Sequence, residues 1–335
     1  MKILKSIGLG LLILIVLLVV VAYLLPRHVK IERTATIKAA PEIVFGQINV
    51  LKNWEQWSPW YKIDPKMKLT YNDIPSGKGA SYSWQSKDKN VGNGTLTITR
   101  IVPYDTIDLE MNFMEQGAVL GGYYFKKKAD STVQLAWWME ADMGNNPIGR
   151  WMGLFMNRLV GKDFEKGLDA IKTISERLGN LPLTLETTTE KPSNYLYIHK
   201  TGSEQEIGKF FMESYPALAK YISEKGAKSS GPPFALYYKW ENDHFDLDIC
   251  MPVNKILKGD QSIKSGKLKG GKILTVKYYG PYEGTGRAHA AAMKWIQDNK
   301  NKIDGAAREV YVTDPMTEKD PAKVLTLIVY PIKKI

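Results

Sequence analysis

The 335-residue sequence contains one cysteine and four histidines. A single cysteine, Cys250, cannot form a disulfide within the chain, so the fold must depend on packed apolar cores. Alternating apolar and polar residues around Cys250 predict a strand, and we expect its thiol to be buried and inert. His28, His199, His244 and His289 lack the spacing of metal ligands, and we expect no metal site.

A strongly basic domain and a nucleotide-binding motif are also missing. The net charge of +11 is spread along the chain, so lysine-rich runs such as 126–128 and 264–272 are read as solvated faces or contacts with anionic lipid. Leu268 follows Lys267 where a P-loop requires Ser or Thr, and Gly284-Thr285-Gly286 is too short for a dinucleotide fingerprint. We therefore expect no nucleic-acid partner and no cofactor.

One long apolar run, residues 7–25, contains nineteen residues without a charge. As a helix it would be about 28 Å long, enough to cross the hydrocarbon core of a bilayer. We predict an uncleaved single-pass anchor in residues 1–26, of the kind found in a bacterial inner membrane. The alternative is a cleaved signal peptide, whose apolar core should be shorter and end in a small-x-small site. Basic residues flank both ends, so charge does not decide the orientation; we expect the soluble domains in the periplasm.

The rest of the chain has ordinary globular composition, with 44% hydrophobic and 24% charged residues overall, and we divide it into domains at 27–182 and 183–335. In the first domain, period-2 patterns predict strands at 30–38, 96–98, 107–113 and 133–139, with a short helix after Pro41. Beyond Pro147 the period becomes helical. We predict one long helix with a single apolar stripe formed by Phe155, Leu159, Phe164, Leu168, Ile171 and Leu178.

This first domain resembles the START-like or SRPBCC superfamily, in the branch labelled polyketide cyclase/dehydrase. The segments that carry the resemblance are Ala40 to Phe45, Asn53 to Trp60 and Gly161 to Leu168. The resemblance implies an α+β helix-grip fold with a hydrophobic cavity between sheet and helix. Trp54, Trp57 and Trp60 either line that cavity or pack in the core, and core packing is favoured. No acid-base pair supports a cyclase reaction.

The second domain contains an internal repeat. The segment Val-Lys-Tyr-Tyr-Gly at 276–280 has a fainter copy, Ile-His-Lys-Thr-Gly, 78 positions upstream, and Pro252 and Pro331, which end the two copies, are 79 apart. Each copy reads strand-helix-strand-strand. Two such units should pair their sheets and leave a groove along a pseudo-twofold axis. Pro216 interrupts the helical pattern of the first copy, so we expect that helix to kink or split.

Several motifs of the second domain resemble the GyrI-like small-molecule-binding domain, which is also the effector-binding domain of AraC- and MerR-type drug-responsive regulators. They are Gly231 to Tyr238, Phe245 to Val253, Gly280 to Glu283, Arg308 to Tyr311 and Val329 to Ile332. The resemblance implies a groove between the repeats that is lined by aromatic residues and contains an acidic residue for cationic or polar ligands. Glu309 is the matching position.

Strand geometry supports this assignment. Glu309 and Tyr311 are two residues apart and share a strand face, and alignment of the repeats places Tyr237 at the position equivalent to Tyr311. Tyr279 and Tyr282 lie at the turn that follows the second copy's first strand. The predicted ligand-binding residues are therefore Glu309, Tyr311, Tyr237, Tyr279 and Tyr282, with no catalytic residue assigned. The alternative for Glu309 is a surface ion pair on an edge strand.

Taken together, the sequence predicts a monomeric, membrane-anchored protein with two ligand-cavity domains for small amphiphilic, aromatic or cationic molecules. Turnover is left open, with binding favoured. Some GyrI-like proteins hydrolyse reactive small molecules, so a hydrolase that uses Glu309 is one alternative. A second is an effector-sensing partner in transcription regulation, although the regulators' helix-turn-helix is replaced here by a second cavity-type domain and an anchor. A scaffold with two collapsed cavities is a third.

Overall fold

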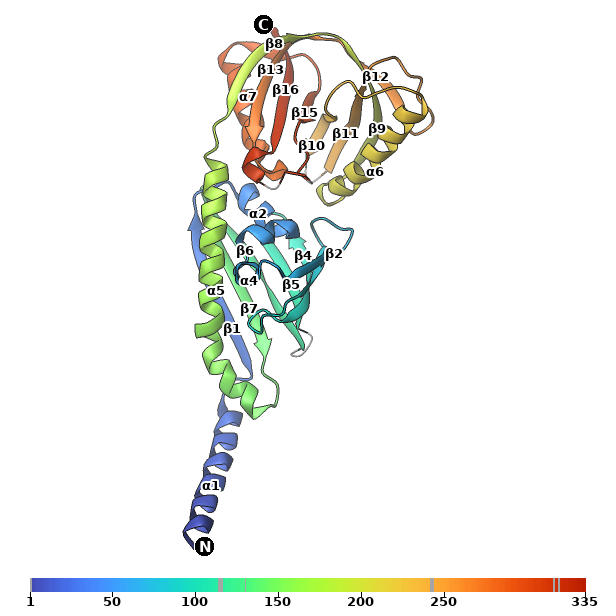
Figure 1. The fold of residues 1–335 in the computed structure, drawn as a ribbon. Coiled ribbons are helices and arrows are strands. Elements are labelled where there is room, and N and C mark those ends of the chain that lie inside the picture. Colours follow the sequence, from blue (N-terminus) through green and yellow to red (C-terminus); the bar gives the residue numbers. More distant parts are fainter. Residues whose placement is uncertain (1, 114–116, 130, 242–243, 316, 319) are drawn as a thin grey trace. The chain divides into compact units, whose positions relative to one another are not determined.

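The computed structural model describes residues 2–113, 117–129, 131–241, 244–315, 317–318 and 320–335. The chain forms two compact units, Met1–Glu176 and Arg177–Ile335 (Figure 1). Each unit contains its own sheet and its own buried apolar clusters. The predicted α+β class, with an N-terminal apolar helix, a helix-grip domain and a duplicated domain, is confirmed.

The first unit begins with the apolar helix α1 (Lys2–Leu24). Its segment Ile7–Leu24 is long and apolar enough to cross a membrane, a property that a signal sequence would share. The end of α1 is bonded to the start of α5 (Pro147–Gly179). The Arg150 guanidinium donates to the carbonyls of Tyr23 and Leu25, both at 3.1 Å, and so satisfies carbonyl groups that a helix end leaves without partners.

The sheet of the first unit has seven antiparallel strands in the order β1-β7-β6-β5-β4-β3-β2. Their bounds are β1 His28–Ile37, β2 Lys68–Tyr71, β3 Ser81–Gln85, β4 Asn93–Val102, β5 Thr106–Phe113, β6 Gly117–Ala129 and β7 Thr132–Asp142. Three short helices, α2 (Pro41–Asn49), α3 (Trp54–Trp57) and α4 (Pro59–Ile63), follow β1, with the 3₁₀ turn Leu51–Asn53 between α2 and α3.

The long helix α5 packs on this sheet, and the contact is formed by the buried face of β7 and the buried face of α5. Alternate residues of β7, from Val133 to Ala141, are buried, and the far half of α5 buries Phe164, Leu168 and Ile171. Trp137 stacks on Phe164 with ring centroids 4.1 Å apart, which joins sheet to helix directly. Burial of aromatic area of this kind is the main driving force for such packing.

The predicted single apolar stripe of α5 is wrong in its first half. Phe155 and Leu159 are exposed, whereas Phe164, Leu168, Ile171 and Leu178 are buried. At 100° per residue, Phe155 and Leu159 lie on the opposite side of the helix from Phe164 and Leu168. The helix therefore has two apolar faces, and only the second covers the sheet.

The second unit is a nine-stranded sheet in the order β12-β9-β11-β10-β15-β16-β13-β8, with β14 paired to β16. The bounds are β8 Thr184–Glu190, β9 Ser193–Ser203, β10 Phe234–Glu241, β11 His244–Val253, β12 Lys264–Leu268, β13 Gly271–Tyr279, β14 Asn301–Ile303, β15 Ala307–Tyr311 and β16 Leu325–Lys334. Two helices, α6 (Glu204–Glu224) and α7 (Gly286–Asp298), complete the repeats, and Tyr282–Gly284 and Pro321–Lys323 form 3₁₀ turns.

The strand order is symmetric about its centre, so β9, β11 and β10 correspond to β13, β16 and β15. The predicted equivalence of the prolines is confirmed by the register: Pro252 pairs with Tyr195, and Pro331 pairs with Ile273, 78 positions later. At the centre, Ala235 lies opposite Glu309. Because the repeat also makes these two positions equivalent, the pseudo-twofold axis passes between them.

Pro216 does not split its helix, because α6 runs from Glu204 to Glu224 with the proline inside it. The missing amide hydrogen leaves the carbonyl of Met212 without its usual partner. Both residues are exposed, so water can bond this carbonyl and the interruption costs little.

Candidate functional site

Glu309 lies on the central strand β15 of the second unit and is only 7% exposed. Its neighbours on the same strand face are Ala307 and Tyr311. On the adjacent strand β10, Ala235 is directly opposite and Tyr237 is two positions further along. A carboxylate buried here needs hydrogen-bond donors, because a buried polar group without partners is costly.

Two tyrosine hydroxyls supply donors to one carboxylate oxygen. Tyr311 and Tyr237 donate to Glu309 Oε2 at 3.0 and 3.3 Å, and the two hydroxyls are 3.1 Å from each other. Burial, and then the neighbouring acidic groups, raise the pKa of both tyrosines well above its usual value. Both side chains are therefore neutral O–H donors over the physiological pH range.

The other carboxylate oxygen is bonded to a histidine from α7. His289 Nε2 lies 2.9 Å from Glu309 Oε1, and His289 Nδ1 lies 2.8 Å from the Tyr330 hydroxyl. Burial raises the pKa of Tyr330 to about 12. The result is a continuous polar chain, from Tyr330 through His289 and Glu309 to the two tyrosines, built from β16, α7, β15 and β10.

Aromatic rings surround this polar chain. The ring of Tyr311 lies 5.1 Å from Tyr282, 5.6 Å from Phe211 and 6.5 Å from Tyr215, measured between centroids. Phe211 and Tyr215 come from α6, one helical turn apart, and stack on each other at 5.6 Å. The Tyr215 hydroxyl is buried and has no hydrogen-bond partner among the described residues. A donor is thus left free beside the carboxylate and its rings.

Comparison with known proteins gives both units a family. A protein-family model described as "GyrI-like small molecule binding domain" matches residues 184–333. A second family model, described as "Polyketide cyclase / dehydrase and lipid transport", matches residues 28–176. The chain joins a polyketide cyclase/dehydrase-type domain to a GyrI-like domain. The suspected order of the two domains is confirmed. A search of curated proteins found no match.

Solved structures also resemble parts of the chain. The C-terminal domain of EcmrR is 19% identical, with 46% of this chain and 100% of that one covered and a TM-score of 0.42. A hydrolase from Listeria innocua is 14% identical over 45% of this chain and 92% of its own, with a TM-score of 0.34. Ara h 8.0201 is 14% identical over 44% of this chain and 99% of its own, with a TM-score of 0.33. Scores this low carry no functional conclusion.

Of the five residues predicted to bind ligand in the GyrI-like domain, four lie together and one lies apart. Glu309, Tyr311, Tyr237 and Tyr282 are linked by the bonds and ring contacts above. Tyr279 is 38% exposed at the end of β13, and within the described residues its ring has no contact with the others. Alternation explains the difference, because its neighbour Tyr278 points into the core.

Sequence reasoning missed His289, Tyr330, Phe211 and Tyr215. A signal was present for three of them. His289 is three and seven residues before the buried Ala292 and Ile296, so helical periodicity already placed it on the inward face of α7. Phe211 and Tyr215 are four and eight residues after Ile207, so helical periodicity placed them on one face of α6. Tyr330 carried no such signal, because its partner His289 is 41 positions away in the sequence.

Cys250 is not bonded to the polar chain, because its thiol donates to the carbonyl of Asp248 at 3.3 Å. It is fully buried on β11, and burial raises the pKa of its thiol well above the usual value, so the thiol stays protonated. The expectation of a buried strand residue is confirmed. Among the described residues, no group of three or more His, Cys, Asp or Glu side chains is placed to hold a metal ion.

In the polyketide cyclase/dehydrase-type domain, Trp54 and Trp57 are core residues. Their indole N–H groups donate to the carbonyls of Ile48 and Gln47, both at 2.9 Å. Trp60 is half-buried against Trp137, with ring centroids 5.8 Å apart. A surface pocket of about 190 Å³ lies beside Trp57, lined also by Pro59, Lys62, Ile63 and Lys166.

Proposed function

We propose that this chain is a membrane-anchored binding protein whose GyrI-like domain binds small aromatic or amphiphilic molecules, with preference for organic cations. The observation that carries the proposal is Glu309, a buried carboxylate surrounded by the rings of Tyr237, Tyr311 and Tyr282. A cation is attracted to such a site by the carboxylate and by the negative faces of the rings. The family description, small molecule binding, supports the coarser part of the proposal.

Ligand entry requires movement of the aromatic side chains. The hydroxyls of Tyr237 and Tyr311 already occupy one carboxylate oxygen, and the rings are in contact around it. A ligand would replace these hydroxyls and rotate rings such as Phe211 or Tyr311, while the free hydroxyl of Tyr215 offers a bond to a polar ligand group. The arrangement thus describes a closed form of the site, with part of the binding energy used to open it.

The test is Glu309→Gln, which retains the side chain's shape and an acceptor oxygen. The affinity for an aromatic cation such as tetraphenylphosphonium should fall by about 1 to 3 kcal/mol, because the variant loses the charge of a desolvated contact. Affinity for the neutral triphenylphosphine oxide should change little. Calorimetric titration of the full chain in detergent measures both.

Glu186→Gln is the matched control, since Glu186 is a surface carboxylate of the same domain, paired with Lys277 at 3.2 Å. It should leave both affinities unchanged. Unaltered cation binding in Glu309→Gln would show that this carboxylate is not part of a ligand site.

Hydrolysis is a second candidate, favoured by the contact between His289 Nε2 and Glu309 Oε1 at 2.9 Å. Because Nε2 faces Glu309 and Nδ1 faces the Tyr330 hydroxyl, a proton from water would pass to the Tyr330 oxygen as the hydroxyl proton moves to Nδ1, and it would return to a leaving group by the same path. If turnover of a strained electrophile such as an epoxide occurs, His289→Gln should lower kcat at least about 100-fold with little change in substrate affinity. Retained kcat in this variant would exclude the pair as the catalytic unit.

For the first domain we extend the proposal to a less polar ligand. Gln47 is fully buried, and neither its amide nitrogen nor its oxygen has a protein partner in the described structure; the Tyr123 hydroxyl is in the same condition. Buried polar groups of this kind usually bind ordered water or a ligand. Native mass spectrometry of the purified chain should detect co-purifying amphiphilic molecules with a polar group that bonds Gln47, and Gln47→Leu should reduce the amount retained.

The anchor belongs to the proposal as well. We propose that α1 stays on the mature chain in a bacterial inner membrane, with the two domains in the periplasm. The intact mass of the membrane-extracted protein decides between an anchor and a cleaved signal, because cleavage would remove about 25 residues.

A further inference from the structure

The exposed apolar face of α5 needs a partner. Ile148, Met152, Phe155 and Leu159 recur at intervals of four, three and four residues and form one stripe, named here the α5 stripe. Ile148 is 71% exposed, Phe155 59% and Leu159 65%. On the same helix the opposite face carries Gly153 and Phe164, which are buried against the domain. The α5 stripe therefore points away from the core of its own domain.

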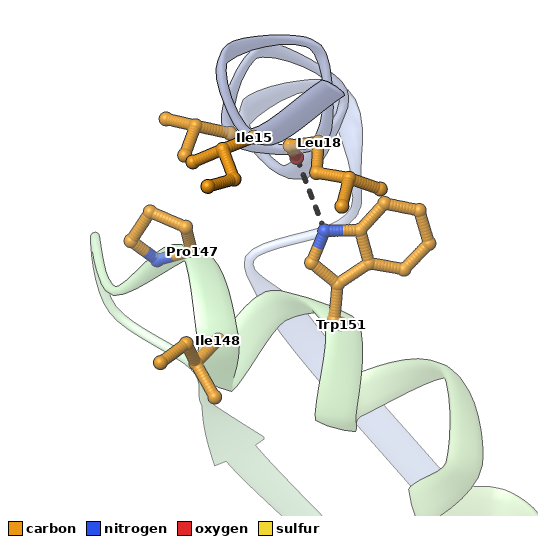
Figure 2. Close-up of a pocket in the computed structure, with 6 residues that line it drawn as sticks. Ile15, Leu18, Pro147, Ile148 and Trp151 are labelled. Carbon is orange, nitrogen blue, oxygen red and sulfur yellow. Dashed lines mark hydrogen bonds between the residues drawn. The ribbon is translucent and has the colours of Figure 1, made fainter. Parts of the chain in front are cut away.

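The position of this stripe relative to α1 indicates its partner. Trp151 Nε1 donates to the carbonyl of Leu18 at 3.1 Å, and Pro147, Ile148 and Trp151 form one wall of an apolar pocket of about 270 Å³ whose other wall is Ile15, Leu18 and Val19 (Figure 2). Leu18 is six residues before the end of α1, which corresponds to about 9 Å along the helix. If α1 spans a bilayer, the first turns of α5 lie inside the leaflet in which α1 ends.

The polar groups around the stripe fit the membrane interface rather than the hydrocarbon centre. Asn145 and Asn146 are exposed just before the helix, which limits its depth. One and two turns beyond Leu159, the same face continues with Lys162 and Lys166, both exposed and near the expected level of lipid phosphates. Trp151 is an indole of the kind enriched at this level.

We propose that the first half of α5 is a second membrane-contacting element, in which the α5 stripe enters the interfacial layer of the leaflet where α1 ends. This inference rests on the proposed anchor. Its consequence is that the polyketide cyclase/dehydrase-type domain is held at the lipid surface instead of moving freely on a tether, because Arg150 and Trp151 also bond α5 to α1. An apolar helix face beside basic side chains is the usual pattern of interfacial helices.

The test uses the full chain in vesicles of zwitterionic and anionic phospholipid. A polarity-sensitive fluorophore is attached through Phe155→Cys, Leu159→Cys, Leu14→Cys in α1, or Asp169→Cys, an exposed position further along α5. Cys250 is buried, and the unmodified chain measures its background labelling. Spin-labelled lipids with shallow or deep labels then quench the fluorophores.

We expect the labels at 155 and 159 to be quenched by shallow spin labels several-fold more than the label at 169, and the label at 14 to be quenched by deep ones. Quenching at 14 without quenching at 155 and 159 would overturn the inference and leave the anchor intact. A blue-shifted but unquenched label at 155 would mean that protein covers the stripe, and would also overturn it. Absence of quenching at all four positions would remove the anchor and the inference together.

Discussion

At the scale of single residues, the site around Glu309 consists of side chains that are far apart in the sequence. His289 and Tyr237 are separated from Glu309 by 20 and 72 positions, yet each bonds to the same carboxylate. The sequence placed Glu309 and Tyr311 on one face because strand periodicity is local, and alignment of the repeats added Tyr237. It did not assign His289, since a helix must be docked on the sheet before that contact exists.

The tyrosine hydroxyls at this carboxylate provide a residue-scale prediction. Burial raises the pKa of Tyr311 well above its usual value of about 10, so a folded chain should not ionise Tyr311 at pH 11. Phenolate absorbance of the native protein at pH 11 should therefore be the same in the parent and in Tyr311→Phe. In urea, where all 18 tyrosines are accessible, the variant should lose one eighteenth of the signal.

The raised pKa of Tyr311 also makes the stability of the folded chain depend on pH. A raised pKa in the folded state means that the folded chain binds more protons above pH 10, so stability falls as pH rises from about 10 toward the folded pKa. This alkaline loss of stability should be smaller in Tyr311→Phe, which has one fewer buried hydroxyl to ionise. A native-state signal at pH 11 that drops in this variant would contradict the burial of Tyr311.

At the scale of elements, α5 shows that a sequence pattern can predict a helix correctly and still assign some residues to the wrong face of it. The helix and its bounds followed from periodicity, but the apolar residues of its first half do not continue the stripe of the second. Contact with the sheet is made by the far half, where Gly167 allows a close approach to buried rings. A Cβ atom there would lie 2.5 Å from Trp137 and 3.3 Å from Pro59.

Gly167→Val should therefore destabilise the first domain by about 2 to 3 kcal/mol, because the added methyl groups must displace buried rings. Gly208→Ala in α6 is the control. A Cβ atom at Gly208 would have no other atom within 4 Å, so removal of a helical glycine should stabilise by about 0.5 to 1 kcal/mol. Urea unfolding followed by tryptophan fluorescence measures both. An unchanged midpoint in Gly167→Val would contradict the tight contact between helix and sheet.

At the scale of the whole molecule, each unit has buried clusters made of its own residues, and within residues 7–24 of α1 only Ala22 is buried. Removal of residues 1–26 should therefore leave both domains folded. We expect the shortened chain in the soluble fraction after ultracentrifugation, with an unchanged circular dichroism spectrum and the mass of a monomer by light scattering. Aggregation of this chain, when the full-length protein is well behaved in detergent, would show that α1 is part of the fold.

The sequence by itself determined the apolar helix, the order of the two domain types, the duplication and the strand that carries Glu309. The helix, the duplication and the strand depend on periodicity and spacing, which are local or repeat along the chain, whereas the two domain types followed from the resemblance of particular segments to known families. Tertiary structure alone decided that His289 and Tyr330 complete the polar chain, that Tyr279 points away from it, and that Phe155 and Leu159 face outward. Each of these depends on the rotation of one element against another, which packing of distant residues determines.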